Sequence, residues 1–272
     1  MARIQLFEFH DLPWFPQAWR DMLTDVLFSF SMTFDPLRPV VPRLKQALVK
    51  SHSTRIIDLG SGGSGPLPLL ERQLAKEENY PVTILMTDKY PNLRAFKRVS
   101  RASGGTIGYI ERPIDAMDVP ADVDAFRTLI TTFHHFAPDA AKKIIKDAID
   151  KKAGLGIFEY TERSLLWFAA SLLSPLYFWV TAPFLLRPFT WGRFFWGYLL
   201  PVPVLLMIWD GIVSNFRTYS PAELQRLVDE ADGGLYEWDI GRVDSFGAAR
   251  VTYLIGVPRR MQEAAGQSGT AT

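Results

Sequence analysis

Short apolar runs alternate with segments of helical spacing along residues 51–163. The apolar runs are bounded by Gly, Pro or polar residues and cover residues 55–59, 82–88, 106–111, 126–132 and 154–160. Runs of this length and composition are typical of buried strands. The segments between them carry apolar residues on one helical face at about 66–78, at 91–101 and again after Pro138. This alternation predicts a parallel sheet with helices on both faces.

The last part of the chain predicts one more helix and a hairpin. Ser220 and Glu223 have the spacing of a capping box around Pro221, so a helix is expected to begin there. Residues 235–243 and 250–257 have the composition of strands and are close enough to pair as a hairpin. We therefore expect an α/β fold, with a doubly wound, Rossmann-like, mostly parallel seven-stranded sheet that ends in an antiparallel hairpin.

The N-terminal segment is rich in aromatic residues and proline. Apolar residues at helical spacing predict an amphipathic helix at about 16–31, and a second helix follows a proline-rich link at about 40–51. The polar face of the first helix has few basic residues, so it does not resemble a helix held to lipid by charge. We expect a helical cap packed on the main domain, with a membrane-surface helix as the alternative.

An apolar block interrupts the chain at residues 164–215. It holds three charged residues, Arg187, Arg193 and Asp210, and five of the eight tryptophans. Its uncharged run at 164–186 is long enough to cross a bilayer, at about 20 residues a span. Prolines would break such helices, and a spanning hairpin would place both arginines outside, against the positive-inside tendency. We expect a monotopic hairpin that dips into one leaflet; a two-span hairpin, a substrate lid and a dimer face remain open.

Composition excludes several classes of function. The net charge is +1 and no cysteine is present, so the chain has no disulfide, no thiolate chemistry and no concentrated basic face for nucleic acid. Its four histidines lack the spacing of a common zinc motif, and we expect no metal. The N-terminus lacks the apolar core of a secretory signal. We expect the protein on the cytoplasmic side of the membrane.

The stretch Arg55-Ile-Ile-Asp-Leu-Gly-Ser-Gly-Gly-Ser-Gly65 joins the first strand to the following helix. Glycines at such a turn let a ligand approach backbone N–H groups and the helix N-terminus. Gly60, Gly62 and Gly65 satisfy the G-x-G-x-x-G pattern of a dinucleotide site. An acid directly before the glycines also suits S-adenosylmethionine (SAM), and the loop alone does not separate the two ligands.

Landmarks further along the chain resemble the class I SAM-dependent methyltransferases. The landmarks are Asp58-Leu-Gly-Ser-Gly62, Asp88 after the second strand, Asp115-Ala116 after the third, Thr131-Thr-Phe-His-His-Phe136 after the fourth, and the closing hairpin. The resemblance spans residues 50–163 and 216–258. The whole chain is also similar to a bacterial group of methyltransferase-like proteins, a likeness that gives no substrate. One departure is Ser64, which stands where the family usually has its third glycine.

The resemblance implies a set of cofactor contacts. Backbone N–H groups would hold the carboxylate of SAM, and carboxylates would accept from its ammonium, ribose hydroxyls and adenine amino group. The carboxylate would be held by the backbone of Gly60, Ser61, Gly62 and Gly63. Asp58 would accept from the ammonium, Asp88 from the ribose hydroxyls and Asp115 from the adenine amino group. The backbone of Ala116 would contact the adenine edge, and Thr131 would lie beside the loop.

The resemblance also orders the parts of the chain. We expect a helical cap at residues 1–50, a SAM-binding core at 51–163, the apolar helical insertion at 164–215, the rest of the core at 216–258 and a disordered tail at 259–272.

Candidate catalytic residues follow the fourth and fifth strands. Removal of a proton from an O or N nucleophile needs a base, for which His134, His135, Glu159 and Tyr160 are candidates. An apolar insertion next to the active-site mouth favours a hydrophobic acceptor such as a lipid, quinone or isoprenoid-like molecule. The expected function is methyl transfer to that acceptor at the membrane surface. The alternatives are an NAD-type oxidoreductase and a non-catalytic, membrane-associated SAM- or lipid-binding protein.

Overall fold

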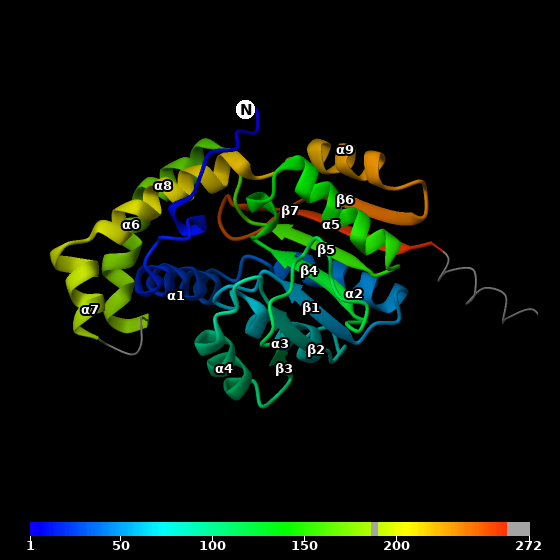
Figure 1. The fold of residues 1–272 in the computed structure, drawn as a ribbon, viewed down its shortest axis with the longest axis horizontal. Coiled ribbons are helices and arrows are strands. Elements are labelled where there is room, and N and C mark those ends of the chain that lie inside the picture. Colours follow the sequence, from blue (N-terminus) through cyan, green and yellow to red (C-terminus); the bar gives the residue numbers. More distant parts are fainter. Residues whose placement is uncertain (186–189, 260–272) are drawn as a thin grey trace, which may run out of the picture.

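The computed structural model describes residues 1–185 and 190–259, and its centre is a seven-stranded sheet (Figure 1). The strands are β1 (Arg55–Leu59), β2 (Thr83–Thr87), β3 (Ile107–Tyr109), β4 (Phe126–Ile130), β5 (Leu155–Glu159), β6 (Tyr236–Asp244) and β7 (Arg250–Pro258). Their order is β3-β2-β1-β4-β5-β7-β6. The first five run parallel, while β7 is antiparallel to both β5 and β6. The expected fold class is confirmed.

Helices cover both faces of the sheet, as Figure 1 shows. The helices of this layered core are α2 (Val41–Lys50), α3 (Leu67–Lys76), α4 (Leu93–Ala102), α5 (Pro138–Asp150) and α9 (Pro221–Ala231). Adjacent residues of β1 point to opposite faces: Ile56 packs in the layer of α2, α3 and α4, and Ile57 in the layer of α5 and α9. Because both faces are covered, every residue of β4 and β5 is buried, including the polar Arg127, Thr128 and Glu159.

Most predicted elements lie within a few residues of their expected bounds. The predicted capping box is present, with Ser220 accepting from the backbone N–H of Glu223 and the Glu223 side chain returning to the Ser220 backbone. The fourth strand is shorter than predicted and ends at Ile130, because Thr131 takes a left-handed conformation with φ of 49°. The predicted disordered tail lies outside the described residues beyond Arg259.

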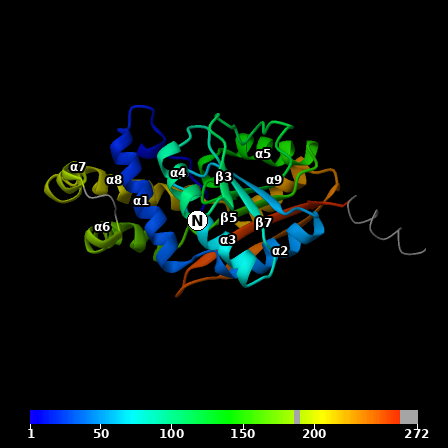
Figure 2. The same ribbon diagram turned by 90° about the horizontal axis from the view of Figure 1, so that it is seen from below.

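Helix α1 (Gln17–Phe34) lies between the core and the apolar insertion (Figure 2). Its apolar face packs on the insertion in a cluster made of Phe15, Met22, Leu23, Val26, Phe178, Ala182, Val204 and Met207. Its last turns reach the core, where Phe30 contacts Tyr160 and Trp167. The N-terminal segment therefore joins the insertion to the sheet.

The insertion folds as a helical hairpin. It comprises α6 (Leu165–Leu185), the short α7 (Trp191–Phe194), a π-helical turn (Phe195–Leu199) and α8 (Val202–Arg217). Among the described residues one helix, α6, is long and apolar enough to cross a membrane. A second candidate exists only if Trp191–Leu199 and Val202–Arg217, which are separated by a bend of 66°, are counted as one span. Only 17% of the apolar window of α6 is buried, so much of its apolar surface faces outward.

Candidate functional site

The glycine loop leaves β1 in a backbone conformation that favours glycine. Positive φ angles occur at Gly60 (76°), Gly62 (49°) and Gly65 (39°). A Cβ on Gly60 would come 2.5 Å from Cγ2 of Thr132, so this position also lacks room for a side chain. Ser64, which is not a glycine, also takes a left-handed conformation, with φ of 81°.

The side chain of Asp58 anchors the loop from inside the protein. Its carboxylate accepts hydrogen bonds of 2.7 Å from both Ser61 Oγ and Thr128 Oγ1. Burial raises the pKa of Asp58 to about 7, although both hydroxyl donors oppose that shift. The residue predicted to face the SAM ammonium thus lies behind the loop and fixes the position of Ser61.

Asp88 lies on the open side of the same loop. Its Oδ2 accepts from the backbone N–H of Gly62 at 2.9 Å, and its Oδ1 from that of Tyr90 at 2.8 Å. Among residues 1–185 and 190–259, no atom beyond the chain neighbours lies within 4 Å of a Cβ built on Gly62 or Gly65, so there is room beside the loop. We call the loop, the open space beside it and the Asp88 carboxylate the cradle.

Asp115 and Ala116 follow β3 at the same edge of the sheet. Asp115 Oδ2 accepts from Lys89 Nζ at 2.9 Å, and the side chain is 34% exposed. Its Oδ1 accepts from the backbone N–H of Met117, which orders this turn, and Ala116 is buried. Thr131 lies at the end of β4, where its backbone N–H donates to the carbonyl of Phe158. The structure thus brings the predicted cofactor residues to one edge, after the carboxyl ends of β1, β2, β3 and β4.

His134 and Glu159 form a buried pair next to this edge. Glu159 ends β5, and its two oxygens accept from the His134 backbone N–H at 3.0 Å and from Nδ1 at 2.8 Å. Both side chains are about 2–3% exposed. A carboxylate on Nδ1 fixes the tautomer with its proton on that nitrogen, which leaves Nε2 able to accept a proton.

His135 has a different environment from its neighbour. Its Nδ1 lies 3.0 Å from Asp11 Oδ1 and 3.6 Å from Glu8 Oε2. Burial lowers the pKa of His135, but the two carboxylates outweigh that effect and raise it to about 9. An imidazolium at neutral pH accepts no proton, so the geometry favours His134 over His135 as a base.

Tyr160 comes directly after β5 and lies where the core meets α1 and the insertion. Its ring is buried between Phe30 of α1 and Trp167 of α6, and its hydroxyl lies 3.4 Å from Ser31 Oγ. Burial raises the pKa of this hydroxyl. The side chain is best explained as packing between the core and the insertion.

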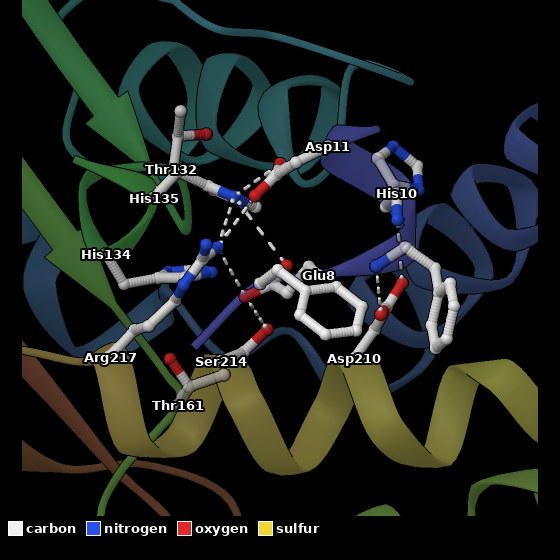
Figure 3. Close-up of polar contacts among 12 residues, drawn as sticks. Glu8, His10, Asp11, Thr132, His134, His135, Thr161, Asp210, Ser214 and Arg217 are labelled. Atoms are coloured by element: carbon white, nitrogen blue, oxygen red, sulfur yellow. Dashed lines mark hydrogen bonds and ion pairs between the residues drawn. The ribbon is translucent and has the colours of Figure 1, made fainter. Parts of the chain in front are cut away.

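A charged cluster beside the two histidines was not predicted as part of the site (Figure 3). It forms where the N-terminal strap, which we define as residues 3–12, lies along α8. Arg217 Nη1 lies 3.0 Å from Glu8 and 2.7 Å from Asp11, while Asp210 accepts the backbone N–H groups of Phe9 and His10 at 2.7 and 3.1 Å. One signal was available in the sequence: Asp210 is the only acid of the apolar block, and a buried carboxylate needs partners.

The same cluster includes a possible set of metal ligands. Glu8, His134 and His135 each place one ligand atom within 4.8 Å of the others. The guanidinium of Arg217 already lies against Glu8, and its charge would repel a metal ion there. His134 also has its Nδ1 on Glu159. The arrangement is better described as an ion-pair network than as a metal centre.

Comparisons with known proteins bear on the fold. No family model and no curated protein matches the chain. Among solved structures, the CMeT domain of the citrinin polyketide synthase aligns with a TM-score of 0.53 at 12% identity, over 92% of this chain and 59% of that one. The fold is the Rossmann-like methyltransferase fold.

Two further structures align less well. A structure described as PigF with SAH has a TM-score of 0.47 at 13% identity, over 82% of this chain and 56% of that one. A Rhodobacter sphaeroides protein described as a Zn-dependent alcohol dehydrogenase has a TM-score of 0.46 at 11% identity, over 89% and 98%. These two scores carry no argument about function. The chain spans less than two thirds of the length of the first two structures.

Proposed function

We propose that this protein is a SAM-dependent methyltransferase that acts on a hydrophobic acceptor at a membrane surface. The observation that carries the proposal is the sheet order, with antiparallel β7 inserted between β5 and β6. The dinucleotide-binding fold has a different order, 3-2-1-4-5-6, without that inserted strand. The sheet order therefore supports SAM over NAD as the ligand of the glycine loop.

The residues at the loop fit the parts of SAM. The backbone of Gly60–Gly63 would hold its carboxylate, Asp88 its ribose hydroxyls, and Asp115 with the Ala116 backbone its adenine. Asp58 would act through Ser61, whose hydroxyl donates to it. When bound, SAM supplies an electrophilic methyl group on a sulfonium.

His134 would remove the proton from the acceptor. Because Glu159 holds Nδ1, Nε2 is the nitrogen that would accept a proton from an acceptor O–H or N–H group. The charge that then forms on the imidazole would be stabilised by the carboxylate at 2.8 Å. The N-terminal strap and α8 cover this pair, which would keep water from the reacting atoms.

The insertion supports a lipid-like acceptor and monotopic binding. Exposed apolar side chains follow one side of the hairpin; they include Leu165, Leu166, Leu172, Leu173, Leu176, Val180, Leu205 and Trp209. The other side is covered by α1 of the same chain. The hairpin thus has one face packed on protein and one apolar face turned outward. This arrangement suits a hairpin that lies in a single leaflet better than two spans that are surrounded by lipid. We propose a location on the cytoplasmic side.

A labelling experiment tests the reaction. The full chain is incubated with methyl-labelled SAM and a total lipid extract, and the labelled product is identified. Label in an apolar product, lost in His134→Gln, supports the proposal. SAM binding without label in any extracted lipid would instead support the non-catalytic alternative.

A further inference from the structure

A cavity of about 240 Å³ separates the tip of the insertion from the core. It lies between the first turns of α1, the start of α4 and the short α7. The side chains that give it its chemistry are Trp19, Asp21, Arg94, Arg193 and Trp196. None of these residues belongs to the glycine loop or to the His134–Glu159 pair.

The cavity carries both signs of charge with an excess of positive charge. Arg94 pairs with Asp21 at 3.0 Å, and Arg193 pairs with Asp25 at 2.5 Å. Asp25 lies outside the lining and is shared with Arg98 at 3.1 Å, so the charged groups that line the cavity itself are Arg94, Arg193 and Asp21. Nη1 of Arg193 is buried and has no hydrogen-bond partner among the described residues. Arg94 on the same lining is 62% exposed, so its guanidinium keeps donors for an anionic group that enters the cavity.

Two indoles add a site for a cation. The rings of Trp19 and Trp196 lie 4.9 Å apart at an interplanar angle of 64°. Both line the cavity together with the carboxylate of Asp21. Indole faces attract ammonium groups, and a nearby carboxylate adds to that attraction. One small cavity thus offers guanidinium groups for an anion and indoles with a carboxylate for a cation.

The position of the cavity selects the source of such a ligand. The segment that lines it also carries apolar side chains outward, with Trp191 77%, Phe195 43% and Leu199 63% exposed. Tryptophan is enriched at the level of lipid headgroups. If these side chains enter a leaflet, the neighbouring cavity lies at headgroup depth.

We infer that this cavity binds the headgroup of a zwitterionic phospholipid, a phosphate diester with a tethered ammonium. Arg94 and Arg193 hold the phosphate, while Trp19, Trp196 and Asp21 hold the ammonium. The inference rests on the membrane association proposed above but not on methyl transfer. The bound lipid anchors the tip of the hairpin and sets the depth of the insertion.

Soluble headgroups test the chemistry of the site. Tryptophan fluorescence of the full chain is titrated with glycerophosphoethanolamine, glycerol 3-phosphate, inorganic phosphate and ethanolamine. The first is expected to bind at least about tenfold more tightly than the others, since only it uses both halves of the cavity. Equal binding of glycerol 3-phosphate or inorganic phosphate would overturn the assignment to a zwitterionic headgroup.

Variants place the binding in the cavity. Arg193→Gln and the more exposed Arg94→Gln are each expected to weaken glycerophosphoethanolamine binding and flotation with phosphatidylethanolamine vesicles by about tenfold. Arg226→Gln on α9, an exposed arginine, is the matched control and should bind as the parent does. SAM titration of each variant reports folding and separates this test from the proposed methyl transfer. Parental binding by both cavity variants would overturn the inference.

Discussion

Nδ1 of His134 lies 2.8 Å from Oε2 of Glu159, and the second oxygen of that carboxylate accepts the His134 backbone N–H. Glu159 ends β5, and His134 lies in the 3-10 turn Phe133–His135 that follows the adjacent parallel strand β4. Because Glu159 occupies Nδ1 and also holds the His134 backbone, Nε2 is the ring nitrogen that is left for chemistry. This relationship distinguishes His134 from the adjacent His135, and it is the basis for proposing His134 as the base.

Removal of that base should reduce turnover without preventing cofactor binding. His134→Gln is expected to lower the rate of methyl transfer by about 10²–10⁴-fold, the range typical of general base catalysis. Glu159→Gln should lower the rate less and change its pH profile, since the carboxylate acts through the histidine. His52→Asn, an exposed histidine outside the site, is the control. Unchanged single-turnover rates in His134→Gln would exclude this role.

The glycine loop allows a test of packing by a paired substitution. A Cβ on Gly63 would come 2.1 Å from Cγ2 of Thr24 on α1, so Gly63→Ala should displace α1 or the loop and weaken SAM binding. Thr24→Ser removes that methyl group and keeps the hydroxyl that donates to the Arg20 carbonyl. The double variant should recover most of the affinity and the thermal stability.

Gly60→Ala is the contrast, because the positive φ of Gly60 adds a strain that no neighbour can relieve. Failure of Thr24→Ser to rescue Gly63→Ala would show that the contact with α1 does not determine the loop.

The charged cluster under the strap predicts a dependence of stability on pH. The folded-state pKa of His135 is about 9, above the ordinary value of 6.5, because Glu8 and Asp11 stabilise the imidazolium against burial and Arg217. A raised pKa gives stability that is fully present below pH 6.5 and is lost as the pH rises through 9. Urea unfolding of the parent and of His135→Asn should therefore differ most at pH 6 and least near pH 10. A difference that stays constant would contradict this account.

Membrane binding should depend on the outward face of α6. Leu172 and Leu173 are 59% and 60% exposed, so glutamate at either position costs little folding energy in water but much in lipid. Leu172→Glu and Leu173→Glu are expected to reduce vesicle flotation severalfold. Leu235→Glu, at an exposed leucine outside the insertion, is the matched control. Equal flotation of all three variants would argue for a lid or dimer face instead.

Local patterns predicted most of the fold. The inner strands β4 and β5 are buried on both faces and so are largely apolar, and the Ser220–Glu223 cap depends only on residues three apart. The loop conformation was also legible, because positive φ and close contacts require glycine at positions such as Gly60. The cap and the positive φ angles are local features, so the residues at those positions predict them.

The charged part of the site could not be predicted in this way. Arg217 meets Glu8 across more than 200 residues of sequence, and no local pattern reports such a contact. The same contacts decide that His135 is protonated, while His134 next to it is paired with Glu159. The direction of the Tyr160 side chain depends on α1 and α6 packing around it. Sequence spacing placed these residues near one edge but could not assign their roles.

Calorimetric titration with SAM and with NAD tests the central claim most directly. We predict one SAM site per chain, no NAD binding, and a loss of SAM affinity of about 10–100-fold in Asp88→Asn, which removes a charged acceptor. Asp118→Asn, at an exposed aspartate outside the cradle, should bind SAM as the parent does. Binding of NAD alone, or unchanged SAM affinity in Asp88→Asn, would contradict the account.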